Sequence, residues 1–168
     1  MTASRPEILA PDRDGTARAV AILGAGGLVA LPTETVYGLA ADATDGRAVA
    51  RIFEAKGRPS FNPLIVHVPD LATAARLAEF PGPAEALAEA FWPGPLTLAL
   101  PLRPGSGLSP LVSAGLPTVA LRVPAHPAMQ SVLRGLGRPI AAPSANPSGR
   151  ISATEARHVL ESLGDRVD

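Results

Sequence analysis

Short apolar runs alternate along the chain with amphipathic segments, a pattern that predicts strands alternating with helices. Apolar runs predict five strands, at 28–31, 64–68, 96–100, 118–123 and 140–142. Helical spacing predicts six helices, from Asp14 to about Leu23, Asp45 to Lys56, Asp70 to about Phe80, Pro83 to Phe91, Pro127 to about Gly135, and after Ser152. Alternation of this kind is typical of an α/β domain.

Two of these helices carry clear end signals. The helix capped by Asp45 should stop at Gly57, and it has an apolar stripe of Val49, Ile52 and Phe53. Ser152 and Glu155 have the spacing of a capping box, S-A-T-E, and are expected to start the last helix. That helix should bury one face made of Ala156, Val159, Leu160 and Leu163.

The predicted architecture is one α/β domain, residues 1–168, with helices flanking a twisted mixed sheet. A Rossmann fold is not expected, because no G-x-G-x-x-G follows a predicted strand. No P-loop is present in the sequence either. A nucleotide, if one is bound, must therefore be held by another arrangement.

Composition narrows the classes of protein that need to be considered. The 16 Gly and 19 Pro indicate many tight turns, and the absence of Cys excludes disulfides and thiolate metal sites. The net charge of zero disfavours tight RNA binding by this chain alone. Met1 to Pro11 has no long apolar run, and no stretch is long enough to span a membrane, so we expect a cytoplasmic protein.

Lys56 is the only lysine among 15 basic residues. Chance is one interpretation, and the need for an ammonium at this position is the other. Arg58 follows two residues later, close to turns rich in Ser, Thr and Asn. Such a pair can cradle a polyphosphate, with the lysine acting as a point charge and the arginine as a fork.

Polar residues interrupt two strands that should be apolar. Arg122 lies in T-V-A-L-R-V and His67 in L-I-V-H-V. A buried unpaired Arg is costly, so Arg122 requires an anion, an open cleft, or a strand whose second face, with Thr118 and Ala120, is solvated. For His67 a core histidine with its hydrogen bonds satisfied is the simpler interpretation.

Five segments together resemble the YrdC-type L-threonylcarbamoyladenylate synthase family. They are P-T-E-T-V-Y-G-L at 32–39, K-G-R-P-x-x-N-P-L-I-V-H at 56–67, W-P-G-P-L-T at 92–97, V-A-L-R-V-P-x-H-P at 119–127 and P-S-A-N at 143–146. The family signature, K-x-R followed far downstream by S-x-N, falls on Lys56, Arg58, Ser144 and Asn146. The resemblance implies that these four residues are catalytic and that the fold is YrdC-like.

The resemblance also implies a reaction. Threonine takes up bicarbonate to form a carbamate, which attacks the α-phosphate of ATP to give threonylcarbamoyl-AMP and pyrophosphate. A separate tRNA-modifying threonylcarbamoyl transferase complex would then use this product to make N6-threonylcarbamoyladenosine. Because the sequence offers no carboxylate cluster, Mg²⁺ would be held mainly by ATP phosphates and water.

Residue roles follow from the same resemblance. Threonine would be bound by Thr35, His67, Arg122 and Ala142. ATP would be bound by Lys56, Arg58, Asn62, Thr118, Ser144, Asn146 and Ser152.

Two other functions stay open. One is carbamoyl-adenylate formation of the kind used in hydrogenase maturation, which a short chain without Cys disfavours. The other is an RNA-binding or ribosome-associated module without turnover, using Arg47, Arg51, Lys56, Arg58 and Arg150. The family pattern continues with a Ser-Thr-Val-Val segment that is absent up to Asp168, so we expect this form to bind ATP but to make the adenylate poorly.

Overall fold

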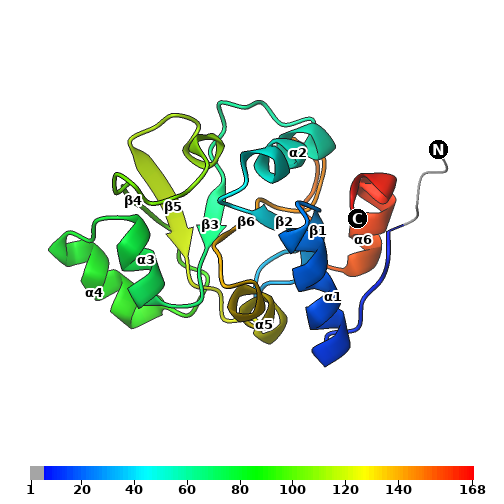
Figure 1. Cartoon of the computed structure of the whole chain (residues 1–168), viewed down its shortest axis with the longest axis horizontal. Helices are drawn as coiled ribbons and strands as arrows, with labels where there is room; N and C mark the ends of the chain where they lie inside the picture. The colour runs from blue at the N-terminus through cyan, green and yellow to red at the C-terminus, as the bar shows by residue number, and fades with distance from the viewer. Residues whose placement is uncertain (1–5) are drawn as a thin grey trace.

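A six-stranded mixed sheet forms the centre of the molecule, in the order β1-β2-β6-β3-β5-β4 (Figure 1). The computed structural model describes residues 6–168, so residues 1–5 of the N-terminal stretch considered above lie outside it. The strands are β1 (Val29–Leu31), β2 (Gly38–Asp42), β3 (Ile65–His67), β4 (Leu98–Pro101), β5 (Thr118–Arg122) and β6 (Ile140–Ala141). Only β3 and β5 run parallel, and every other neighbouring pair is antiparallel.

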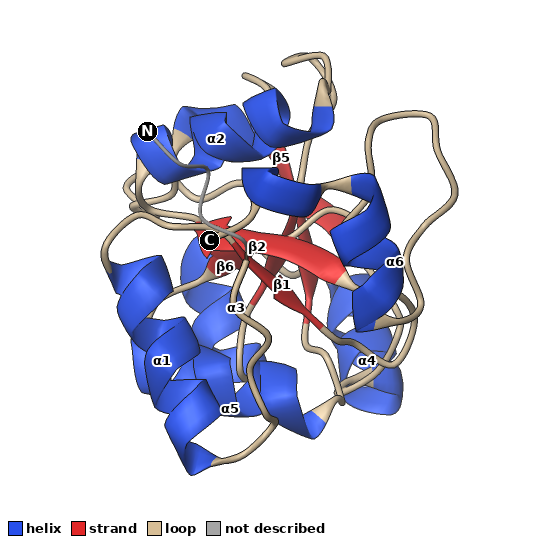
Figure 2. Cartoon of the chain, turned by 90° about the vertical axis from the view of Figure 1, so that its right-hand side faces the viewer, coloured by secondary structure: helices blue, strands red, loops and turns tan. Residues whose placement is uncertain are grey.

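Helices cover both faces of the sheet. They are α1 (Arg13–Gly24), α2 (Gly46–Lys56), α3 (Leu71–Leu77), α4 (Gly82–Phe91), α5 (Pro127–Leu136) and α6 (Ala156–Ser162), with 3-10 turns η1 (Pro110–Ser113) and η2 (Gly164–Arg166). Figure 2 shows the sheet between α2 on one side and the adjacent α1 and α5 on the other. The predicted α/β architecture with a mixed sheet is confirmed. None of the helices within residues 6–168 is long and apolar enough to cross a membrane.

Two apolar clusters hold these layers together. The larger packs Ile52 of α2 against Val66 and Leu121 on one face of the sheet. The smaller packs Leu133 of α5 against Ile140 on the other face. This second cluster extends over β1, β2 and β6 but includes no residue of β3, β4 or β5. The part of that face formed by β3 and β5 is therefore outside this apolar cluster, and His67, Thr118 and Arg122 lie there.

Local signals explain most helix ends. The Asp45 carboxylate accepts from the backbone N–H of Arg47 at 2.8 Å, and Gly57 ends α2 with a φ of 58°, as predicted. The start of α1 was predicted wrongly, since Asp12 rather than Asp14 is the N-cap and accepts from Gly15 N at 2.8 Å. α3 stops at Leu77 instead of Phe80 because Ala78 becomes extended and bridges to Leu102.

The predicted capping box of the last helix is not formed. α6 begins at Ala156, and its N-cap Glu155 makes no side-chain cap hydrogen bond. Val159 and Leu163 are buried as expected, whereas Ala156 is exposed and Leu160 is only half-buried. Ser152 lies in the preceding loop, where it remains free for another role.

Candidate functional site

The candidate site lies along the less covered face of β3 and β5. Thr118, Ala120 and Arg122 share this face, alternating with the buried Val119 and Leu121. Thr118 and Ala120 are half-buried, which confirms that this side of β5 is not packed like the other. Thr118 and Arg122 are four positions apart on the strand, or roughly 13 Å. Polar groups therefore occupy two ends of one face rather than a single crevice beyond the strand ends.

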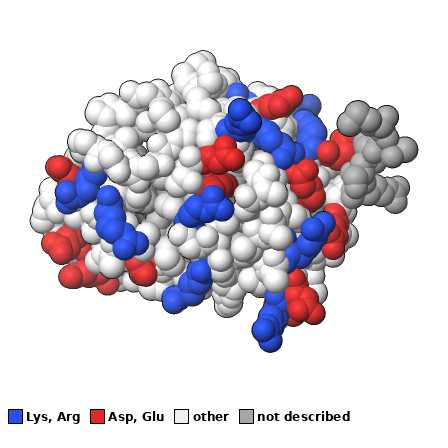
Figure 3. All heavy atoms as spheres, viewed as in Figure 1, with Lys and Arg blue, Asp and Glu red and all other residues white. Residues whose placement is uncertain are grey.

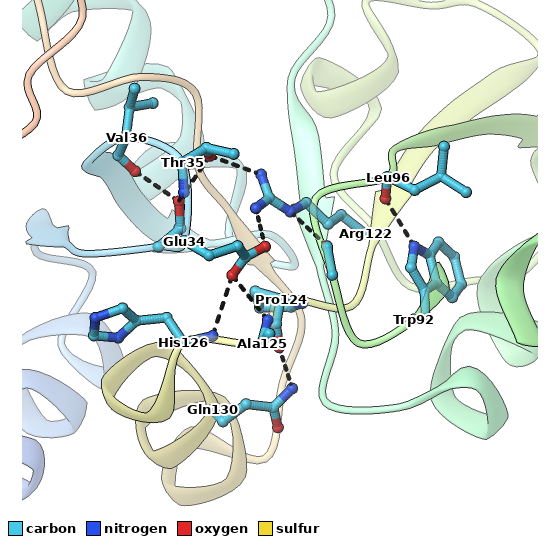
Figure 4. A network of polar contacts seen from close by, with 12 residues as sticks. Glu34, Thr35, Val36, Trp92, Leu96, Arg122, Pro124, Ala125, His126 and Gln130 are labelled. Atoms are coloured by element: carbon cyan, nitrogen blue, oxygen red, sulfur yellow. Dashed lines mark hydrogen bonds and ion pairs between the residues drawn. The ribbon is translucent and has the colours of Figure 1, made fainter. Parts of the chain in front are cut away.

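Arg122 anchors one end of this face. It is 6% exposed, and its Nε donates to the Gly94 carbonyl at 3.1 Å. Its Nη1 donates to Thr35 Oγ1 at 3.1 Å, and its Nη2 donates to Glu34 Oε1 (Figure 4). The interpretation of Arg122 as a solvated strand residue is therefore wrong, because the side chain is buried and paired with an anion.

The Thr35 hydroxyl belongs to a directed chain of hydrogen bonds. The Thr33 hydroxyl donates to the Val36 carbonyl at 2.7 Å and lies 2.9 Å from Thr35 Oγ1. Because Thr33 has already used its proton, Thr35 must donate to Thr33. Thr35 Oγ1 meanwhile accepts from Arg122, so toward a ligand it is an acceptor and has no proton left to give.

His67 is the register partner of Arg122 on the parallel strand β3, so the two side chains leave the same face. It is 2% exposed, and its Nδ1 has no hydrogen-bond partner among residues 6–168. Burial, and then the charge of Arg122, lower the pKa of His67 to about 4. His67 therefore places a neutral imidazole beside a guanidinium, and its Nδ1 is unused within the described residues.

Lys56 lies at the end of α2 and ties down the loop after β6. Its Nζ donates to the carbonyl oxygen of Ser144 at 2.5 Å and to that of Asn146, and the residue is 2% exposed. Burial, and then the nearby Arg58, lower its pKa to about 8. The contacts of this ammonium are therefore backbone carbonyls, and one N–H of the charged form is left for a ligand.

Arg58 lies in the turn between α2 and β3. Its Nη2 donates to the Pro63 carbonyl at 3.0 Å and its Nε to the Asn62 carbonyl at 3.4 Å. Burial lowers its pKa. Pro63 comes just before Ile65, where β3 begins, whereas His67 at the other end of β3 is level with Arg122. Arg58 thus lies toward the end of β3 that is opposite Arg122.

The loop after β6 reaches the same end. Ala142 donates its N–H to Ile65 O at 2.9 Å, and Ser144 is bridged to Gly38. The Asn146 amide nitrogen donates to the carbonyls of Pro147 and Arg150 at 2.9 and 2.8 Å. Asn146 Oδ1 is buried without a partner among the described residues. Asn146 therefore shapes this loop and keeps one unused acceptor.

Most of the remaining predicted residues are less buried than Arg122, His67 and Lys56. Asn62, Thr118, Ser144 and Ser152 are all half-buried, and Ala142 is 5% exposed. Within residues 6–168, His, Asp and Glu form no group of three or more that could hold a metal ion. The donors at this end are cations, hydroxyls and amides, a set that suits phosphate oxygens better than a bare divalent ion.

Two residues of the site escaped the sequence analysis. Glu34 was taken as part of a turn, although it pairs with Arg122 across 88 positions. Gly94 was part of W-P-G-P-L-T, but its carbonyl holds Arg122 Nε. A Cβ at Gly94 would lie 2.3 Å from the Phe91 carbonyl oxygen, which explains the need for glycine here. The sequence did contain a signal for Glu34: an Arg in an apolar strand needs an anion if it is buried, and an acidic side chain of the same chain can be that anion.

Comparison with known proteins identifies the family. The model for Sua5, YciO and YrdC proteins, described as "Telomere recombination", matches residues 21–168. The chain belongs to the Sua5/YciO/YrdC family. The resemblance inferred from five sequence motifs is thereby confirmed, and the match takes in both ends of the candidate site.

Individual relatives of the family are close in sequence and structure. The chain is 52% identical over 155 residues to a threonylcarbamoyl-AMP synthase of Bacillus subtilis, covering 90% of this chain and 44% of that protein. It is 53% identical over 145 residues to one of Pyrococcus abyssi, covering 85% and 42%. A crystal structure of P. abyssi Sua5 complexed with L-threonine matches with a TM-score of 0.89 at 47% identity, covering 96% of this chain and 47% of that one. The chain thus spans less than half the length of these relatives.

Proposed function

We propose that this chain forms L-threonylcarbamoyladenylate from L-threonine, bicarbonate and ATP, acting as a nucleotidyltransferase. The amine of threonine forms a C–N bond with bicarbonate, and water leaves. A carbamate oxygen then bonds to the α-phosphorus of ATP, and the bond to the bridging oxygen breaks to release pyrophosphate. The register of His67 beside Arg122, with Arg58 bound to the segment at the opposite end of β3, is the observation that carries this proposal.

The Arg122 end suits a hydroxyl-bearing amino acid. A guanidinium can take the substrate carboxylate. His67 is neutral at physiological pH and has an unused nitrogen, so it can hydrogen-bond the substrate hydroxyl. Thr35 Oγ1 can accept from the substrate amine or hydroxyl. A site that bonds a substrate hydroxyl rejects analogues lacking it, so threonine is the expected substrate, with serine next and valine far behind.

The Arg58 end suits the phosphates of ATP. Phosphoryl-group transfer needs charge neutralisation and alignment more than a protein nucleophile. Arg58 and Lys56 supply the charge, while Asn62, Thr118, Ser144 and Ser152 supply neutral polar groups and Asn146 holds the loop. Mg²⁺ would be bound mainly by phosphate oxygens and water, and would offset the phosphate charge.

An RNA-binding module without turnover has less support. Lys56 is buried, and Arg51 is paired with Asp168 at 2.7 Å, so two of its five proposed cations are engaged. Figure 3 shows positive and negative side chains interspersed on the face seen in Figure 1, rather than a field of one sign. We propose that direct tRNA contact is weak and that the product passes in the cytoplasm to a threonylcarbamoyl transferase complex.

The decisive experiment is to incubate the chain with ATP, Mg²⁺, L-threonine and bicarbonate, and to detect the adenylate by mass spectrometry together with pyrophosphate. The expected result is a product that requires both threonine and bicarbonate, and that is reduced strongly when valine replaces threonine. If carbamoyl phosphate, which brings its own nitrogen, replaced threonine and bicarbonate and gave a carbamoyl-adenylate, the result would support the hydrogenase-type alternative. Salt-sensitive RNA binding without any adenylate would support the RNA-binding alternative.

A further inference from the structure

The Glu34 carboxylate is held on both oxygens. Oε1 accepts from Arg122 Nη2, and Oε2 accepts from the backbone N–H groups of Ala125 and His126 at 2.9 and 3.1 Å. Figure 4 shows Glu34 between the guanidinium and the turn that leads into α5. Burial alone would raise the pKa of Glu34, but the hydrogen bonds from Arg122 and from backbone N–H groups lower it overall. Glu34 is therefore an ionised link between three segments.

This link determines which donors of Arg122 stay free. A guanidinium has five N–H donors. Gly94 O, Thr35 Oγ1 and Glu34 Oε1 take one each, from Nε, Nη1 and Nη2 respectively. Among the contacts of residues 6–168, one N–H on each terminal nitrogen remains. Two donors on adjacent nitrogens can bind one carboxylate in a bidentate way.

A substrate carboxylate could compete with Glu34 for Arg122 and displace it. The contacts of Glu34 argue against such displacement. Its departure would break the ion pair of Arg122, whose side chain is only 7% exposed, and would leave two backbone N–H groups without their acceptor. An incoming carboxylate could replace the charge of Glu34 at Arg122, but the N–H groups of Ala125 and His126 would still hold Glu34 Oε2 in place. The pair is therefore expected to persist when a second carboxylate binds.

We infer that Glu34 is a positioning residue for the amino-acid carboxylate: it holds the guanidinium of Arg122 so that its two remaining N–H donors bind that carboxylate. The inference rests on the proposed function and deepens it. Because Glu34 offsets the charge of Arg122, the pair has no net charge when the zwitterionic amino acid first binds.

The test is direct binding of L-threonine to the chain by calorimetry, with ATP binding measured separately. Glu34→Gln keeps the size of the side chain but removes its charge. It should weaken threonine binding about tenfold or more, the scale of one charge-assisted hydrogen bond, and leave ATP binding unchanged within about twofold. The matched control is Glu7→Gln, which removes an exposed ion pair with Arg18 and should change neither affinity.

A double-mutant cycle shows whether Glu34 acts through Arg122. Arg122→Lys lacks the fork, so adding Glu34→Gln to it should reduce threonine affinity little further. Full additivity would overturn the inference, as would unchanged or tighter threonine binding in Glu34→Gln, or equal loss of ATP binding. If Glu34→Gln does not fold, Glu34→Asp serves under the same criteria, since it keeps the charge but is one methylene shorter. A wild-type chain that binds ATP but no threonine would contradict the proposed function itself, and the inference with it.

Discussion

His67 and Arg122 stand side by side on the parallel strands β3 and β5, 55 positions apart in sequence and level in register. The arrangement brings a neutral imidazole to a buried guanidinium. A protonated His67 would add a second buried cation, which burial and Arg122 both oppose. The pair can therefore offer one fixed charge and one neutral hydrogen-bonding group to the same small ligand.

This arrangement predicts how the free energy of unfolding depends on pH in the acid range. The unfolded chain binds a proton on His67 near pH 6.5, whereas the folded chain does so only near pH 4. Stability is thus fully present above pH 6.5 and falls as the pH drops toward 4, by about 3 kcal/mol at most. Denaturant unfolding at several pH values should show a steeper loss between pH 6.5 and 4 in the wild type than in His67→Gln. Parallel profiles in the two proteins would contradict the assignment.

Lys56 should make the free energy of unfolding depend on pH in the alkaline range rather than in the acid range. Its pKa is about 8 in the folded chain and 10.5 when exposed, so between these values only the unfolded chain retains the proton. Stability should therefore rise with pH across this window in the wild type, relative to Lys56→Met, which cannot titrate. ATP affinity should fall over the same range if the third proton of Lys56 contacts phosphate. Flat ATP affinity would assign Lys56 to holding the loop alone.

Replacing Lys56 should also destabilise the chain at neutral pH. Lys56→Ala leaves the carbonyls of Ser144 and Asn146 without their donor, which should cost about 1–3 kcal/mol. Urea unfolding followed by circular dichroism measures this cost. Arg47→Ala, at an exposed position on the same helix, is the control and should change stability by less than about 0.5 kcal/mol.

Thr33 should affect threonine binding without touching the ligand. Thr33→Val removes the acceptor of the Thr35 proton, so Thr35 Oγ1 is no longer held toward Arg122 by two partners. We expect threonine affinity to fall about fivefold, on the scale of one neutral hydrogen bond. Thr73→Val, on α3, is the matched control, and calorimetric titration distinguishes the two. Equal affinities in both variants would mean that the hydroxyl chain does not organise the site.

Gly94→Ala should disturb the Arg122 end of the site by shifting the backbone carbonyl that Arg122 Nε binds. The added Cβ would meet the Phe91 carbonyl oxygen at 2.3 Å, so the segment carrying the Gly94 carbonyl has to shift. We expect a loss of stability of about 1–3 kcal/mol and weaker threonine binding. Gly82→Ala meets nothing within 4 Å and is the control. A wild-type melting temperature in Gly94→Ala would contradict this account.

Sequence patterns predicted most of the elements but missed one central strand. β2 is completely buried, yet its sequence, G-L-A-A-D, has neither alternation nor β-branched residues. Its identity as a strand comes from pairing with β1 and β6, which no local pattern records. The capping box failed for a related reason, because the loop before α6 pairs elsewhere: Tyr37 donates to the Ala153 carbonyl at 2.8 Å.

The sequence marked candidate residues for the site but could not predict their geometry. Motifs located Lys56, Arg58, Ser144 and Asn146, and strand patterns marked His67 and Arg122 as unusual. They could not show that Lys56 binds backbone carbonyls. Nor could they show that Glu34 completes the site, because an acidic residue in a turn is ordinarily solvated.

The order of strands in the sheet has a consequence for biosynthesis. β6 lies between β2 and β3, so the strand that joins the two halves of the sheet is the last of the six to leave the ribosome. Until Ile140 and Ala141 emerge, β2 and β3 each present an unpaired edge, and the Lys56 contact with the 144–146 loop cannot form. Contacts this distant in sequence slow folding. A nascent chain should therefore remain sensitive to proteases and bound by chaperones until β6 and the 144–146 loop have been translated, and then become resistant in one step.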